Sequence, residues 1–163
     1  MSDATPATAR FTRDGWSRAG YSGFRPLLTL DLDRVPTGGG VYAVIRPTTD
    51  PPTFLNRSRG GHFKGQDPTV DIAVLDANWV DGAETLNIGK ADVLRRRLGE
   101  YRDYGNGKAV AHRGGRYIWQ LADAGELLIC WSVTTDDPRV VERGLIFDFV
   151  AAHGHRPFAN LVD

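Results

Sequence analysis

The chain has 163 residues, of which 41% are hydrophobic and 25% are charged, and its 20 basic and 20 acidic residues give a formal net charge of zero. This length and composition are typical of one ordinary globular domain, and the neutral balance argues against strong indiscriminate binding to nucleic acid. No apolar run approaches the roughly 20 residues of a membrane helix, and the polar start lacks the apolar core of a secretory signal.

The first part of the chain alternates loop-like and apolar stretches. Residues 1–10 are expected to form a disordered tail, residues 22–34 to pack on the core as an irregular leader, and residues 35–39 to form a turn. The β-branched and aromatic run 41–45 predicts a strand, and Gly40 before it allows the backbone to approach a neighbour closely.

Residues 47–83 are rich in Pro and Gly and are interpreted as a long, loop-like segment. One short helix is expected within it, with Asp67 and Pro68 as its N-cap and first residue. Loops this long inside a domain are often functional, so substrate specificity could reside here. Residues 86–88 predict a second strand, antiparallel to the first.

A helix is predicted over residues 91–104. Its apolar stripe consists of Leu94, Leu98 and Tyr101, and Arg97 falls within the same stripe by its spacing. An arginine that points inward needs an anionic partner, because an unpaired buried charge is very costly. Arg97 is therefore the strongest physical indication of a site in the chain.

The segment 90–116 is basic, with two Lys and six Arg against three acidic residues. It could neutralise phosphates on one face of the molecule, and it could equally be a solvated helix face followed by a basic loop. The loop supplies His112, Arg113 and Arg116 as candidate substrate-binding residues.

The last part of the chain predicts one strand and one helix. Residues 117–121 fit a short helix or a strand, whereas residues 126–133 predict a strand that contains the single Cys130. A lone cysteine excludes an internal disulfide and fits a reducing cytosol, so Cys130 is expected in the core and the protein in the cytoplasm. The Asp137-Pro138 pair predicts the start of a helix that ends near Gly154.

Three patches, far apart in the chain, together resemble the GIY-YIG nuclease domain. The sequence GGVY at 39–42 is similar to the first motif, with Val for Ile, and NIGKA at 87–91 is similar to the second. Arg97 stands at the family's distance from the second motif. Glu142 on a helix and PFAN at 157–160 resemble the closing motifs. The helix start most resembles the N-terminal catalytic domain of the bacterial excision-repair endonuclease.

The resemblance covers residues 36–162 and implies an α+β fold with a small three-stranded antiparallel sheet flanked by helices. Residues 11–163 would form this single domain, with residues 47–83 as a long insertion between the first two strands. One position departs from the pattern, since Asn87 replaces the tyrosine of the second motif. Asparagine can form hydrogen bonds but cannot ionise.

The activity that the resemblance implies is a divalent-metal-dependent endonuclease that hydrolyses DNA phosphodiester bonds. A single Mg²⁺ or Mn²⁺ would be bound by Glu142, because one carboxylate, waters and a phosphate oxygen suffice for such an ion. Tyr42 would act as general base, with its pKa lowered from about 10 by Lys90 and the metal. Arg97 would clamp the phosphate with its planar fork. The expected catalytic residues are Tyr42, Lys90, Arg97, Tyr101 and Glu142, and the expected substrate-binding residues are Asn87, His112, Arg113, Arg116 and Asn160.

Two other functions stay open. Asn87 and the zero net charge favour a nucleic-acid-binding module that does not cleave. The modest charge and a lid-like insertion favour an enzyme on the same fold that acts on a small anionic molecule. Without a second DNA-binding domain, specificity would come from the insertion and basic loops, from a partner protein or from a homodimer.

Overall fold

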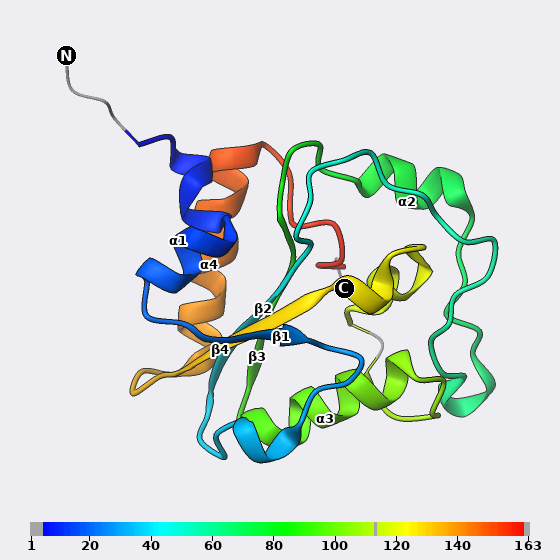
Figure 1. The fold of residues 1–163 in the computed structure, drawn as a ribbon, viewed down its shortest axis with the longest axis horizontal. Helices are drawn as coiled ribbons and strands as arrows, with labels where there is room; N and C mark the ends of the chain where they lie inside the picture. Colours follow the sequence, from blue (N-terminus) through cyan, green and yellow to red (C-terminus); the bar gives the residue numbers. More distant parts are fainter. Residues whose placement is uncertain (1–4, 113, 162–163) are drawn as a thin grey trace.

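The computed structural model describes residues 5–112 and 114–161, and its centre is a sheet of four antiparallel strands (Figure 1). The strands are β1 (Ser22–Pro26), β2 (Gly40–Ile45), β3 (Thr85–Ala91) and β4 (Leu128–Val133), and they lie in the order β1-β4-β2-β3. Helices flank this sheet, so the fold is α+β as predicted. The prediction of three strands is wrong.

The additional strand is β1, which lies where the sequence predicts an irregular leader. It pairs with β4, and the register shifts between Gly23 and Arg25. Gly23 has a φ of 103°, and a Cβ there would lie 2.6 Å from the ring of Trp131. Because the residues of β1 are exposed or half-buried throughout, no apolar alternation marks the strand in the sequence.

β2 is buried along its whole length, because both of its faces are covered. Tyr42 belongs to one apolar cluster, which α3 completes, and Val41 belongs to a second cluster with residues of α1 and α4. Gly40 approaches β4 so closely that a Cβ there would lie 2.1 Å from the carbonyl oxygen of Ser132, as its place before the strand predicts. Cys130 is fully buried in the second cluster, which confirms its expected place in the core.

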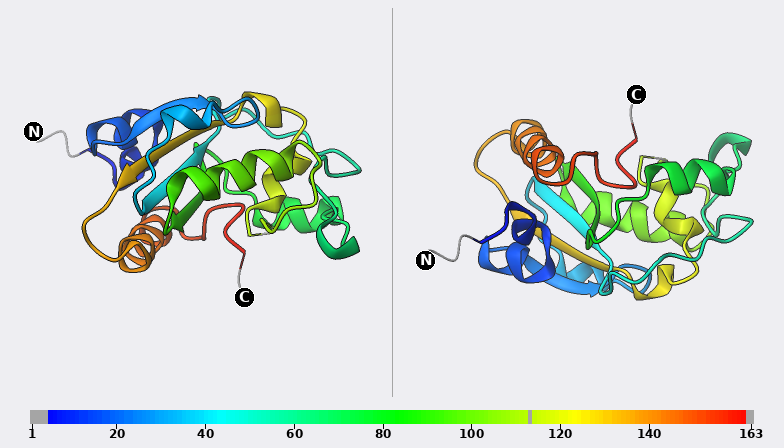
Figure 2. Two further views of the ribbon diagram at one scale, coloured as in Figure 1. Left: turned by 90° about the horizontal axis from the view of Figure 1, so that it is seen from below. Right: turned by 90° about the horizontal axis from the view of Figure 1, so that it is seen from above.

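Two groups of helices lie on opposite sides of the strands (Figures 1 and 2). On one side are η1 (Ala7–Phe11), a 3-10 helix, α1 (Arg13–Arg18) and α4 (Pro138–His153). On the other side is α3 (Leu94–Gly105), which packs near the short 3-10 helix η2 (Leu32–Arg34). Residues 7–10, expected in a disordered tail, thus contribute to η1.

α4 begins and ends where the sequence predicts. Asp137 caps it by accepting a hydrogen bond from the backbone N–H of Arg139, and Pro138 occupies the first helical position. Gly154 follows the last residue with a φ of 75°, a conformation that favours glycine.

The other helix boundaries differ from the predicted ones. α3 begins at Leu94 rather than residue 91, because β3 continues to Ala91 and pairs there with Gly40. α2 (Ile72–Asn78) follows Asp71, so the expected cap at Asp67 is wrong. The undecided residues 117–121 fall largely within a 3-10 helix. The remaining 3-10 helices are η3 (Phe63–Gly65), η4 (Arg116–Gln120) and η5 (Ala124–Glu126), and η5 occupies the expected start of the last strand.

The segment 46–84 between β2 and β3 is fixed to the rest of the fold by buried polar side chains. Gln120 is 1% exposed, and its amide donates hydrogen bonds to the carbonyl oxygens of Leu55 and Val70 at 3.0 and 2.8 Å. Arg46 forms an ion pair with Asp123 at 2.8 Å. Replacing Gln120 or Arg46 by an apolar residue would leave the groups that they bind without hydrogen bonds, which lowers stability.

Candidate functional site

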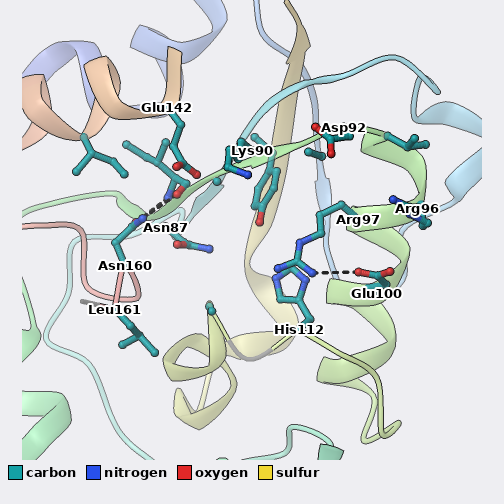
Figure 3. Close-up of a pocket in the computed structure, with 18 of the residues that line it drawn as sticks. Asn87, Lys90, Asp92, Arg96, Arg97, Glu100, His112, Glu142, Asn160 and Leu161 are labelled. Carbon is teal, nitrogen blue, oxygen red and sulfur yellow. Dashed lines mark hydrogen bonds and ion pairs between the residues drawn. The ribbon is translucent and has the colours of Figure 1, made fainter. Parts of the chain in front are cut away.

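A pocket of about 420 Å³ opens between the sheet, α3 and α4, and most of the predicted site residues line it (Figure 3). Lys90 and Glu142 lie on one wall and Arg97 on the opposite wall. The predicted residues at the pocket are Tyr42, Asn87, Lys90, Arg97, His112, Glu142 and Asn160. The pocket is also lined by Asp92, Arg96, Glu100, Ile146, Arg156 and Leu161, which the motifs do not mark.

Two of the predicted site residues that the structure describes are not part of the pocket lining. Tyr101 is fully buried behind the wall. Arg116 lies beside a neighbouring hollow, where its guanidinium stands 5.6 Å from the ring centroid of Tyr117. Arg113 lies outside the described residues. No residue of the segment 46–84 lines the pocket, so the expectation that this segment supplies specificity or a lid has no support in the lining.

Tyr42 reaches the pocket because its cross-strand neighbour is a glycine. Tyr42 on β2 pairs with Gly89 on β3, and a Cβ built on Gly89 would lie 2.2 Å from Cζ of Tyr42 and 2.3 Å from its hydroxyl oxygen. Side chains directly opposite one another on a sheet face normally compete for this space. The glycine of the second motif therefore makes the room in which the tyrosine of the first motif lies.

The phenol of Tyr42 is held in its protonated form. Burial raises its pKa from 10.0 to about 12, and the positive charge of Arg97 opposes this shift only in part. Glu142 and Glu100 raise the pKa further. The charge of Lys90 lowers the pKa of Glu142, and the role of Tyr42 as a general base activated by Lys90 and a metal stays a prediction.

Arg97 lies at the rim of the pocket rather than within the apolar stripe of α3. Its side chain is 34% exposed, so Arg97 is half-buried and less deeply inward than the spacing predicts. The anionic partner expected for it is present: its guanidinium forms an ion pair with Glu100 at 3.0 Å and donates a hydrogen bond to the carbonyl oxygen of Ala111 at 3.0 Å. A ligand that binds this guanidinium therefore has to compete with Glu100 for it.

Asn87 joins the second motif to α3. Its side-chain amide donates a hydrogen bond to the hydroxyl of Tyr101 at 2.9 Å, and that hydroxyl donates to the carbonyl oxygen of Gly115 at 3.2 Å. Burial raises the pKa of Tyr101 well above its ordinary value. Tyr101 therefore fixes the loop after α3 against the sheet.

His112 is a buried, neutral side chain at the edge of the pocket. It is 1% exposed and stacks on the ring of Tyr101, with 3.9 Å between centroids. Burial, and to a smaller extent the charge of Arg97, lower its pKa well below the ordinary value. Its Nδ1 atom has no hydrogen-bond partner among the described residues, so this imidazole retains a free polar atom close to Arg97 and the pocket.

Glu142 is half-buried and surrounded by positive charge. Burial raises its pKa, while Lys90, Arg156, Arg139 and Arg143 all act to lower it. No three His, Cys, Asp or Glu side chains within residues 5–112 and 114–161 gather closely enough to hold a metal ion. Glu142 alone fits a hard ion such as Mg²⁺ only if waters and an anionic ligand supply the remaining oxygens.

Asn160 attaches the C-terminal segment to the site. Its Oδ1 accepts a hydrogen bond from the backbone N–H of Ile88 at 2.8 Å, and its Nδ2 donates to the carbonyl oxygen of Ile88 at 2.8 Å. The backbone N–H of Ala159 donates to the carbonyl oxygen of Leu86 at 2.8 Å. These bonds hold the C-terminal segment folded back on the core, and they use both polar ends of the Asn160 amide.

Comparisons of the chain with protein-family models, curated proteins and solved structures find no match. The GIY-YIG resemblance therefore stays a prediction from the motifs. In the described part of the chain, no helix has both the length and the apolar character needed to cross a membrane.

Proposed function

We propose that the protein is a cytoplasmic, divalent-metal-dependent endonuclease of the GIY-YIG class that hydrolyses DNA phosphodiester bonds. The observation that carries the proposal is the convergence of Tyr42, Arg97 and Glu142, from three separate elements, on one pocket. The sequence motifs predict these three residues independently of where the fold places them. In this proposal residues 47–83 are an insertion in the family's fold.

The described side chains suit a phosphodiester better than a neutral ligand. Arg97 presents a planar guanidinium to two oxygens of one phosphate, and Lys90 adds a second positive charge on the opposite wall. Tyr42, protonated at neutral pH, donates its hydroxyl proton in a hydrogen bond to a phosphate oxygen or a water. Preoriented donors of this kind stabilise the charge that develops on phosphate oxygens during hydrolysis.

A divalent ion at Glu142 would neutralise phosphate charge and hold a water for attack. The four cations that act on Glu142 disfavour a free Mg²⁺ or Mn²⁺ there. A phosphate bound by Lys90 and Arg97 offsets this repulsion. We therefore expect the ion to bind together with the nucleic acid rather than before it.

A second candidate function is a nucleic-acid-binding module that does not cleave. The raised pKa of Tyr42 favours it, because a protonated phenol does not accept a proton. The position that would hold a second phenol is Asn87, whose amide is committed to Tyr101. The two functions share the basic pocket and differ only in whether water is activated.

A plasmid-nicking assay separates these two functions. Supercoiled plasmid is incubated with the protein and Mg²⁺ or Mn²⁺, with EDTA as the metal-free control. Glu142→Gln removes the carboxylate charge with little change in volume, and Asp148→Asn makes the same change at an exposed position of α4 outside the pocket. Metal-dependent nicking that Glu142→Gln abolishes and Asp148→Asn retains supports the endonuclease. A plasmid that is retarded but not nicked supports the binding module. A plasmid that is neither nicked nor retarded contradicts both functions.

A further inference from the structure

A second hollow continues from the candidate pocket along the outer side of α4. It has a volume of about 570 Å³ and shares Lys90, Glu142, Ile146 and Arg156 with the pocket. Its own contribution comes from Arg139, Arg143 and Phe147 of α4. We call this hollow the α4 groove. An extended ligand that leaves the pocket on the Glu142 side would enter the α4 groove directly.

The α4 groove carries more positive charge than its own residues neutralise. Lys90, Arg139, Arg143 and Arg156 line it together with a single carboxylate, Glu142. Within the described residues, none of these four cationic side chains forms an ion pair. The chain as a whole has no net charge, so this local surplus marks a place where an anion is attracted.

Phe147 gives the α4 groove an aromatic surface as well as charge. Its side chain is 75% exposed, and among the described residues it is the one aromatic side chain in the set of large exposed hydrophobic residues. A ligand that covers this ring removes apolar surface from water, which is favourable. Because Phe147 stands beside Arg143 and Arg139, that ligand should offer both a flat apolar face and negative charge.

Single-stranded nucleic acid has both properties. Its phosphates bind to cationic grooves, and its unpaired bases stack on aromatic side chains. In a duplex the base faces are covered by their neighbours, so a duplex could use the cations but not the ring. We propose that the α4 groove binds a single-stranded segment of the substrate, with one unpaired base stacked on Phe147. The proposal rests on the proposed function in placing this segment next to the bond to be cleaved.

Binding without metal tests the groove separately from cleavage. A fluorescein-labelled oligothymidylate is titrated with the full chain in EDTA, with fluorescence anisotropy as the readout and a labelled blunt-ended duplex of two strands as comparison. Phe147→Ala should weaken oligothymidylate binding about 10-fold and leave duplex binding unchanged. Phe147→Trp should bind the oligonucleotide and show quenched tryptophan emission on binding. Arg143→Ala should lower the salt slope of binding by about 0.7, whereas Arg18→Ala on α1 should not.

Val140→Ala is the matched control, since Val140 is 62% exposed on the same helix but does not line the α4 groove. Equal binding by Phe147→Ala and the unchanged protein overturns the proposal. It is also overturned if Phe147→Ala and Val140→Ala alter self-association, measured by light scattering, and not oligonucleotide binding. Phe147-dependent binding without metal-dependent nicking would leave the groove assigned and contradict the endonuclease. Metal-dependent nicking together with oligonucleotide binding that does not change in Phe147→Ala would support the endonuclease and contradict the role of the α4 groove.

Discussion

The ring of Tyr42 occupies the space that a side chain at Gly89 would need, because a Cβ on Gly89 would lie 2.2 Å from Cζ of Tyr42. We expect Gly89→Ala to displace Tyr42 and to lower the free energy of unfolding by about 1–3 kcal/mol. In the double variant with Tyr42→Ala the clash is absent, so the two effects should fall short of additivity by about 1 kcal/mol or more. Urea unfolding of the four proteins measures this coupling.

Gly144→Ala is the matched glycine control for that cycle. A Cβ at Gly144 meets no atom within 4 Å, and the residue lies inside α4. Replacing it should raise stability by up to about 1 kcal/mol, because alanine favours a helix over glycine. Loss of stability similar to that of Gly89→Ala would contradict the special role of the Tyr42 contact.

Stability at alkaline pH should depend on Tyr42. Its pKa is raised from 10.0 to about 12, so the folded protein retains the phenolic proton more strongly than the unfolded chain does. The contribution is fully present below pH 10 and is lost as the pH rises through about 12. Between these values the unchanged protein should lose more stability than Tyr42→Phe in urea unfolding. Equal losses would show that the phenol is not held protonated by the fold.

The ion pair between Arg97 and Glu100 should compete with the substrate for the guanidinium. Arg97→Ala should reduce nicking by about 10²-fold or more through lost phosphate stabilisation. Glu100→Gln should tighten oligonucleotide binding a few-fold, because a part-exposed pair contributes only about 0.2–1 kcal/mol. Arg34→Ala, which removes an exposed charge remote from the pocket, is the control. Weaker binding by Glu100→Gln would mean that Glu100 positions Arg97 rather than competes with phosphate.

Stability at acidic pH should depend on His112. Burial lowers its pKa well below 6.5, so the unfolded chain binds a proton that the folded protein excludes. This contribution is present above pH 6.5 and is lost as the pH falls below that value. Stability should therefore decrease less steeply from pH 7 to pH 5 in His112→Phe than in the unchanged protein. His62→Gln, at an exposed position, should follow the unchanged protein.

The sequence predicts those elements that have a local signal, either a run of apolar residues or a helix-start residue. β2, β3, β4 and α4 are detectable because they are rich in apolar residues or carry a Pro at the first helical position. β1 is not, since its residues are partly exposed and Gly23 departs from ordinary strand geometry. Its pairing depends on Trp131 of a strand more than 100 residues later in the chain, a relationship that no local pattern records.

The motif residues of the site are also detectable from sequence, whereas their surroundings are not. Helical spacing places Arg97 near the apolar stripe, but it does not show that Glu100 draws the guanidinium to the rim. The lowered pKa of His112 depends on its burial and on the charge of Arg97, and His112 is buried where it stacks on Tyr101. Arg156 reaches the pocket only because the C-terminal segment folds back. The pair of Arg97 and Glu100 is local to α3, but the stacking of His112 and the return of the C-terminal segment are tertiary contacts, so composition and periodicity carry no trace of them.

The hydrogen bonds of Ala159 and Asn160 to β3 have a consequence for colloidal behaviour. β3 is the outermost strand of the sheet on its side, and its residues are almost entirely buried. A free strand of this kind is a template on which other chains add strands and form intermolecular sheets. The side-chain amide of Asn160 occupies both backbone groups of Ile88 and so denies them to a second molecule. Ending the chain at residue 156, which removes Ala159 and Asn160, should therefore cause aggregation as well as weaker ligand binding at the pocket.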